Sequence, residues 1–166
     1  CAEVIAPAPS LSNDRAVRAQ EMALRIAGDL GVVGMLAVEL FDTGDELFVN
    51  ELAMRPHNSG HWTIEGAVTS QFENHLRAVL DLPLGDPRAR ARHAVMVNIL
   101  GGEVEDLYSA YRHVLARDPE LKVHLYGKAV RPGRKVGHVT LLGDDADGLL
   151  ARGRHAADYF TGNIDE

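Results

Sequence analysis

VVGMLAVELFDTGDELFVNELA, residues 32–53, contains two apolar runs rich in β-forming residues on either side of a short polar cluster. The runs predict strands over residues 32–41 and 47–53. Between them, residues 42–46 read DTGDE, a composition typical of a turn. The stretch therefore predicts a β-hairpin.

The register of this hairpin predicts two facing carboxylates. With a turn centred near Asp45, opposed residues have numbers that sum to about 90, so Glu39 lies opposite Glu51. Like charges in facing positions are destabilising, and a divalent cation, with the amide oxygen of Asn50 as a further ligand, would resolve the conflict. A polar edge on which both glutamates are solvated is the alternative, because a slip of one residue would turn Glu51 to the other face. Spacing alone leaves both interpretations open.

RPHNSGH, residues 55–61, follows the second strand directly and predicts a binding loop. The arginine is a planar donor suited to phosphate or carboxylate, and the other polar side chains add donors. A zinc site at His57 and His61 is a weaker alternative, because the proline and the glycine oppose a helical HxxxH arrangement. Each histidine alone is typical of a hydrogen-bonded surface loop, but the density of polar groups favours an anion or a polar small molecule. The candidate binding residues are Arg55, His57, Asn58 and Ser59.

YGKAVRPGRKVGH, residues 126–138, gathers positive charge around a Pro-Gly turn in an otherwise acidic protein. Such a turn can aim its cations at one phosphate. Composition alone favours a solvated hairpin tip, and a phosphate site requires the turn to fold back toward residues 55–61. The cations are Lys128, Arg131, Arg134 and Lys135.

The remaining sequence predicts helices and strands on both sides of a linker. Before the hairpin, Ser12 caps a helix over residues 14–30, and after it a helix begins at Ser70, with Glu73 at capping-box spacing, and ends near Asp81. PLGDPRARAR, residues 83–92, has the composition of a linker. Beyond it, strands are expected at residues 93–101, 122–128 and 136–143, and helices at residues 104–117 and 147–160. The expected domains are residues 1–82 and a small α+β domain over residues 93–166.

Composition limits the class of protein. The 166 residues are 46% apolar with a formal net charge of −7, which fits a globular protein and gives no overall basic surface for nucleic acid. Cys1 is the single cysteine, so a disulfide within the chain is impossible and a reducing cytoplasm is expected. No apolar run is long enough to cross a membrane. Because the chain starts without methionine, inside what reads as a strand, we expect a preceding portion.

Three segments together resemble the 5-(carboxyamino)imidazole ribonucleotide synthase family, the ATP-grasp carboxylases of purine biosynthesis. They are LAVELF at residues 36–41, FVNELAMRPHNSGHWTIEGAVTSQFENHLRAVLDLPLG at residues 48–85, and LYGKAVRPGRKVGHV at residues 125–139. The NELAxRPHNSGH signature is highly specific, whereas paired glutamates on strands occur throughout the ATP-grasp enzymes. The resemblance implies an α+β protein with the C-terminal half of an ATP-grasp domain followed by a small C-terminal domain.

The resemblance also implies a reaction. ATP phosphorylates bicarbonate to carboxyphosphate, which carboxylates the amine of 5-aminoimidazole ribonucleotide to a carbamate and leaves ADP and phosphate. Glu39 and Glu51 would hold Mg²⁺ or Mn²⁺, with Asn50 and Glu51 at the nucleotide, and Arg55 and His57 would be catalytic. The residues implied to bind the substrate are Asn58, Ser59, Lys128, Arg134 and Lys135.

Members of this family carry a further nucleotide-binding part in front, so the resemblance implies that the chain alone is inactive and that the complete enzyme is a homodimer. Its expected partners are ATP, bicarbonate and the ribonucleotide, without nucleic acid or membrane. Two alternatives stay open. Another ATP-grasp ligase would keep the glutamate pair but not the two loops, and a non-catalytic binding or oligomerisation module would need neither.

Overall fold

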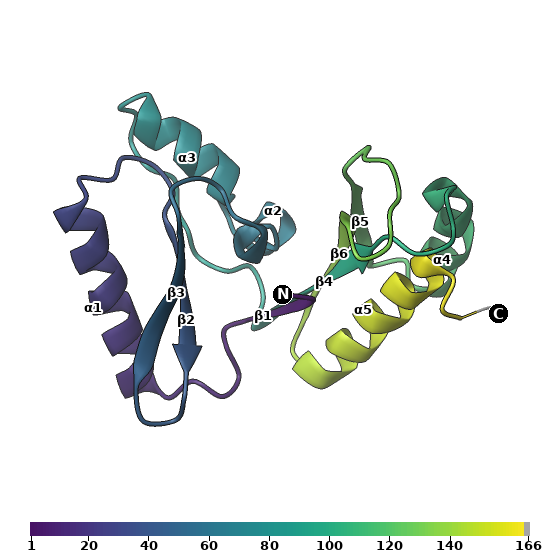
Figure 1. Ribbon diagram of the computed structural model, residues 1–166, viewed down its shortest axis with the longest axis horizontal. Coiled ribbons are helices and arrows are strands. Elements are labelled where there is room, and N and C mark those ends of the chain that lie inside the picture. The colour runs from purple at the N-terminus through teal and green to yellow at the C-terminus, as the bar shows by residue number, and fades with distance from the viewer. Residues whose placement is uncertain (165–166) are drawn as a thin grey trace. The chain divides into compact units, whose positions relative to one another are not determined.

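The computed structural model describes residues 1–164 and divides the chain into two compact units. One unit comprises residues 8–89, and the other comprises residues 1–7 together with the described residues from 90 onward. Both contain helices and antiparallel strands, which confirms the predicted α+β class (Figure 1). Residues 1–7 thus belong to the same compact unit as the C-terminal part of the chain. The division into domains of residues 1–82 and 93–166, which placed these first residues in the N-terminal domain, stays a prediction.

The unit of residues 8–89 is a hairpin with helices beside it. Arg15 of the first helix forms an ion pair with Asp42 of the hairpin at 2.9 Å. None of the residues of this first helix is buried. The elements are α1 (Asn13–Asp29), β2 (Ala37–Asp42), β3 (Leu47–Ala53), the 3-10 turn η1 (Asn58–Gly60), α2 (Thr63–Gly66) and α3 (Gln71–Val79).

The predicted hairpin is confirmed, with a later start for its first strand. Strands β2 and β3 pair antiparallel, and Gly44 supplies the left-handed turn residue with φ 95° while its N–H donates to Asp42 Oδ1 at 3.0 Å. Strand β2 begins at Ala37 rather than at residue 32. The preceding segment is not extended because Gly34 has φ 105°, and the Met35 N–H donates to His75 Nδ1 at 3.1 Å instead of to a strand.

The start of α3 is also as predicted. Ser70 Oγ accepts a hydrogen bond from the Glu73 N–H at 3.2 Å, so one of the free donors of the first turn is satisfied. The helix ends before Asp81, whose φ of 54° takes the chain out of the helical conformation. No helix or strand runs through residues 83–92, where Ala89 alone forms a single bridge with Ala67.

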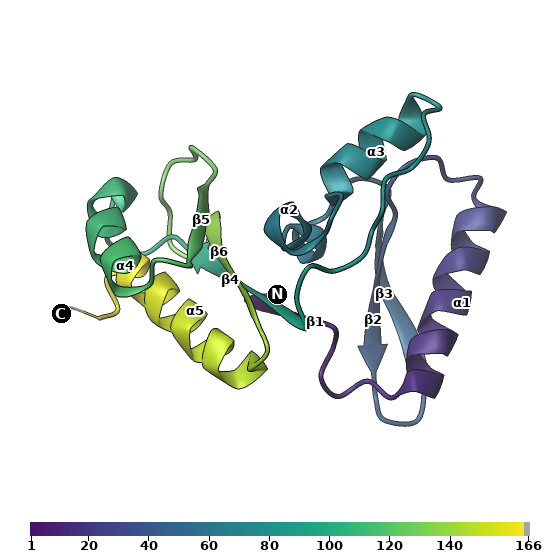
Figure 2. The ribbon, with the colours of Figure 1, turned by 180° about the vertical axis from the view of Figure 1, so that it is seen from behind.

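The second unit is built on a four-stranded antiparallel sheet in the order β1-β4-β6-β5 (Figure 2). The long strands β4 and β6 each contain six consecutive buried residues, and α5 packs on these strands to close a core that includes Val97, Val139 and Phe160. Strand β1 pairs with β4, which is why residues 1–7 belong here. The elements are β1 (Glu3–Ala6), β4 (His93–Leu100), the 3-10 turn η2 (Leu107–Ala110), α4 (Tyr111–Arg117), β5 (Lys122–Leu125), β6 (Lys135–Gly143) and α5 (Ala146–Thr161).

Two predicted elements in this unit are shorter than expected. The helix expected over residues 104–117 is a 3-10 turn followed by α4, because Asp106 accepts the Tyr108 N–H at 3.0 Å and caps the chain only at that point. The strand expected over residues 122–128 ends at Leu125, since Gly127 adopts a left-handed φ of 62°. Apolar periodicity gave the type of each element but not these interruptions.

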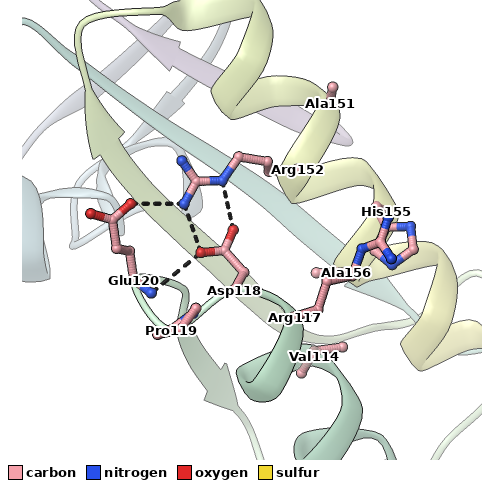
Figure 3. A pocket seen from close by; sticks show the side chains of 9 residues that line it. All are labelled: Val114, Arg117, Asp118, Pro119, Glu120, Ala151, Arg152, His155 and Ala156. Carbon is pink, nitrogen blue, oxygen red and sulfur yellow. Dashed lines mark hydrogen bonds and ion pairs between the residues drawn. The ribbon is translucent and has the colours of Figure 1, made fainter.

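An arginine links α5 to the segment that leads into β5. Arg152 donates from Nε and Nη2 to both carboxylate oxygens of Asp118, at 2.7 and 2.6 Å, and from Nη2 to Glu120 at 2.9 Å (Figure 3). The side chain of Asp118 is only 13% exposed, so this bidentate pair is partly shielded from water. The hydrogen bond from Arg152 holds the pKa of Asp118 below its usual value.

This pair predicts a pH-dependent stability. A carboxyl whose pKa is lowered by folding stabilises the folded state above its unfolded pKa, and that contribution is lost as the pH falls through the folded pKa. Asp118→Asn should therefore lower the free energy of unfolding by about 1 kcal/mol at pH 7 and by progressively less below about pH 4. Urea unfolding followed by circular dichroism measures both proteins. In an Arg152→Gln background the difference should vary much less with pH, because only the backbone N–H groups of Glu120 and Leu121 then still lower the pKa of Asp118, and a variation of equal size there would contradict the assignment.

Candidate active site

The facing carboxylates predicted from the hairpin are present. Glu39 of β2 is the register partner of Glu51 of β3. Beyond this pair the register shifts, because Leu40 pairs with Val49 and leaves Asn50 as an extra residue in β3. Such a β-bulge re-aims side chains locally.

The bulge explains how Asn50 joins the two glutamates. In a regular strand, Asn50 and Glu51 would point to opposite faces. With the bulge, Asn50 Nδ2 donates to Glu39 Oε2 at 3.2 Å. Glu39, Asn50 and Glu51 therefore form one polar group at the end of the hairpin.

His57 lies against this group. Its Nε2 is 3.5 Å from Glu39 Oε1, and the ring is mostly shielded, with 13% of the side chain exposed. The Ser59 N–H donates to His57 Nδ1 at 3.3 Å, and Ser59 Oγ lies 2.9 Å from the same nitrogen. An accepting Nδ1 leaves the proton of the neutral ring on Nε2, facing Glu39. Glu39 thus has one oxygen toward His57 and the other toward Asn50.

Gln71, the first residue of α3, fixes the loop that carries His57. Its Oε1 accepts from the His57 N–H at 3.0 Å, and its Nε2 donates to the His57 carbonyl at 2.8 Å. The same Nε2 lies 2.8 Å from His61 Nδ1. The role of this residue could not be predicted from the sequence, because a glutamine at the start of a helix has no distinguishing pattern. The only sequence signal was its place next to the capping residue Ser70.

Arg55 and Ser59 lie with His57 around a small cavity of about 170 Å³. Arg55 is exposed, and its Nη1 donates to the Pro56 carbonyl at 3.1 Å. Asn58 is half-buried in η1 but does not line this cavity. The lining residues are Met35, Leu36, Ala37, Arg55, His57, Ser59, Gly60 and Gln71.

The basic turn belongs to the other unit. Its shape is set by backbone bonds, since the Gly133 N–H donates to the Gly101 carbonyl at 3.0 Å and the Gly101 N–H donates to the Arg134 carbonyl at 2.7 Å. Arg134 Nη1 donates to the Ala129 carbonyl at 3.2 Å. Lys128 lies with its ammonium 5.2 Å from the centre of the Tyr126 ring. The convergence of this turn with residues 55–61 would join two separate units and stays a prediction.

Glu39, Asn50 and Glu51 carry the hard oxygen atoms that a metal such as Mg²⁺ binds, but they do not form a complete metal site by themselves. Within residues 1–164, no cluster of three or more His, Cys, Asp or Glu side chains could hold a metal ion. Glu39 and Glu51 supply the carboxylates that Mg²⁺ takes when water and phosphate oxygens complete its shell, and Asn50, whose amide also carries an oxygen, is bonded to Glu39 through Nδ2. The residues therefore fit Mg²⁺ bound together with a nucleotide.

Comparison with known proteins agrees with these features. Residues 1–72 match the ATP-grasp domain family, and residues 94–152 match the phosphoribosylaminoimidazole carboxylase C-terminal domain family. The N5-carboxyaminoimidazole ribonucleotide synthase of Mycobacterium tuberculosis is 58% identical over 165 residues, which are 97% of this chain and 38% of that protein. The chain thus spans well under half of the length of this relative.

Solved structures give the same result. A carboxyaminoimidazole ribonucleotide synthase from Aspergillus clavatus complexed with ATP superposes with a TM-score of 0.86 at 36% identity, over 99% of this chain and 44% of that one. An N5-carboxyaminoimidazole synthase of the same fungus, in complex with ADP and 5-aminoimidazole ribonucleotide, gives 0.85 at 37% identity, over 96% of this chain and 44% of that one. With its ATP-grasp segment, its C-terminal domain and this degree of identity, the chain belongs to the N5-carboxyaminoimidazole ribonucleotide synthase family.

Proposed function

We propose that this chain takes part in the ATP- and bicarbonate-dependent carboxylation of 5-aminoimidazole ribonucleotide to its N-carboxy form. The single observation that carries the proposal is the Glu39–Asn50–Glu51 group at the end of the hairpin, with His57 directed at Glu39. Phosphoryl transfer from ATP needs carboxylates that hold a metal ion at the phosphates. The similar Aspergillus clavatus structure is a complex with ADP and the ribonucleotide. A homodimer in the cytoplasm is part of the same proposal.

Glu39, Glu51 and Asn50 would hold Mg²⁺ or Mn²⁺. When bound there, such an ion neutralises charge on the phosphoryl group that passes from ATP to bicarbonate. The hairpin contributes two facing carboxylates, and the bulge brings the Asn50 amide to them, with Nδ2 bonded to Glu39. Asn50 and Glu51 are also the residues that would lie next to the nucleotide phosphates.

Arg55, His57, Asn58 and Ser59 would contact bicarbonate or the ribonucleotide. The exposed guanidinium of Arg55 suits the bidentate binding of a carboxylate or phosphate. His57 carries its Nε2 proton toward Glu39, so a substrate oxygen near the small cavity would meet both a donor and an acceptor. These contacts would orient carboxyphosphate and the amine for carbon–nitrogen bond formation.

Lys128, Arg134 and Lys135 would bind the ribonucleotide phosphate. Backbone bonds to Gly101 pre-shape their turn, which reduces the entropy cost of bringing several cations to one anion. Exposed cations contribute little one by one, so the proposal depends on the turn and residues 55–61 facing the same substrate.

Within residues 1–164, no helix is both long and apolar enough to span a membrane.

A chimera tests the proposed activity. Because this chain matches 38% of the Mycobacterium tuberculosis relative, it can replace the matching 165 residues of that protein. The chimera should release phosphate from ATP only when bicarbonate and 5-aminoimidazole ribonucleotide are both present, and should form the carbamate in equal amount. A folded chimera whose ATP hydrolysis ignores the ribonucleotide would contradict the proposal.

Glu51→Gln in the chimera tests the carboxylate pair. The substitution keeps the shape but removes one charge that would hold the metal, so we expect kcat to fall by about 100-fold or more. It also relieves repulsion with Glu39, so thermal stability should not fall. Phosphate release and a melting curve measure the two effects. Glu46→Gln, in the turn of the same hairpin, is the matched control and should retain kcat, and a Glu51→Gln enzyme with full turnover would rule out the metal role.

Lys128→Ala in the chimera tests the phosphate site. Loss of one charge-assisted contact should raise KM for the ribonucleotide about tenfold and leave KM for ATP nearly unchanged. The rise should shrink in high salt, because screening already weakens this contact in the unsubstituted chimera. Lys122→Ala, an exposed lysine of β5 in the same unit, is the control for the loss of positive charge. An unaltered KM for the ribonucleotide in Lys128→Ala would return the turn to a solvated surface.

A further inference from the structure

Gln71 is a buried polar side chain whose hydrogen-bonding groups all serve one loop. Only 5% of the residue is exposed, and an amide is costly to bury unless its donors and acceptor are paired. Oε1 accepts from the His57 N–H, and Nε2 reaches the His57 carbonyl and His61 Nδ1. A flipped amide would place donor against donor at His57, so its orientation is unique. The glutamine therefore holds the backbone of His57 on both sides.

The loop is shaped to fit this amide. A Cβ at Gly60 would lie 2.4 Å from Gln71 Oε1, so only a glycine lets the loop pass so closely. Thr63 links the start of α3 to the same loop, because its Oγ1 accepts the Gln71 N–H at 2.9 Å and donates to the Gly60 carbonyl at 2.6 Å. The absence of a side chain at Gly60 thus leaves the space that the Gln71 amide occupies.

With its backbone held, the His57 ring has one favourable arrangement. The Ser59 N–H, two residues on, donates to Nδ1, and Nε2 then faces Glu39. Gln71 bonds to the backbone of His57 rather than to Glu39, yet it sets where the imidazole proton points.

We propose that Gln71 is a positioning residue, which keeps His57 with Nδ1 as the acceptor and Nε2–H directed at Glu39. The role deepens the proposed carboxylation and rests on it, since it assigns Gln71 to the step in which His57 takes part. A merely structural glutamine would affect the stability of the loop alone. Substitution of a positioning residue changes the tautomer of His57 and the rate of the chemical step, with little effect on nucleotide binding.

The helix itself offers a matched control. Asn74, one turn after Gln71 in α3, clamps a backbone in the same way, since Oδ1 accepts from the Gly85 N–H at 2.8 Å and Nδ2 donates to the Gly85 carbonyl at 3.5 Å. Its loop carries none of the candidate residues. Gln71→Leu and Asn74→Leu therefore remove comparable amide clamps, one at the candidate site and one away from it.

Imidazole nitrogen–proton correlation spectra of the ¹⁵N-labelled 166-residue chain test the orientation directly. At about pH 8, where an ordinary histidine is neutral, His57 should show a single Nε2–H tautomer, assigned by its loss in His57→Asn. Gln71→Leu should give averaged signals from two tautomers, whereas Asn74→Leu should leave the signals of His57 unchanged. Unchanged signals in Gln71→Leu would overturn the proposal. Should that variant not fold, Gly60→Ala displaces the amide instead and must produce the same averaging.

Kinetics of the chimera test the consequence. Gln71→Leu should lower kcat about tenfold or more with KM for ATP within about twofold, because a small misplacement of a reacting group costs rate rather than ATP binding. Asn74→Leu should keep kcat within about twofold of the unsubstituted chimera, even if both variants melt at lower temperature. Equal kcat values for Gln71→Leu and Asn74→Leu would overturn the positioning role. An inactive chimera, or full activity in His57→Asn, would instead refute the proposed function, and the spectra of the chain would still decide the role of Gln71.

Discussion

The candidate site depends on the register of one short hairpin. Facing like charges destabilise a strand pair, and β2 and β3 keep Glu39 opposite Glu51 nonetheless. The bulge next to them adds Asn50 to the same side, and its amide bonds to Glu39. Without that extra residue, the asparagine would face away from the glutamates. A local irregularity therefore brings a hydrogen-bonding amide to one carboxylate of a repulsive pair.

The two units are stabilised in different ways. In residues 90–164, large aliphatic side chains and Phe160 close a core between the sheet and α5. In residues 8–89, the buried residues are small or polar, and large apolar side chains such as Leu24 and Leu76 are 73% and 58% exposed. Polar clamps, chiefly the amides of Gln71 and Asn74, hold the loops there. These hydrogen-bonded amides fix the orientation of side chains in the loops more than they add hydrophobic stability. The buried residues of this unit are Ala53, Gly66, Ala67, Thr69 and Gln71.

Much of this arrangement follows from sequence patterns that act over short distances. The turn around Gly44 and the capping of α3 by Ser70 are local, and both were predicted correctly. The pairing of β1 with β4 joins residues more than eighty positions apart, and periodicity contains no information on such partners. The bulge at Asn50 and the clamp of Gln71 depend on a one-residue irregularity and on a tertiary contact, so alternation of residue types could not show them. The fold class was therefore predictable, whereas the aim of individual side chains was not.

The two groups of candidate residues share a principle of construction. His57 is aimed by the buried amide of Gln71, while Lys128 lies over Tyr126, whose hydroxyl is 2.7 Å from Nδ1 of His138, itself only 1% exposed. His57 is thus held by a polar group shielded from solvent, and Lys128 lies over a ring whose hydroxyl contacts another such group. Buried polar groups are costly, and equally large apolar residues would stabilise the fold better. The placement of Gln71 behind His57 is consistent with a site in which geometry matters more than stability, because ligand groups held in advance lose less entropy when the substrate binds.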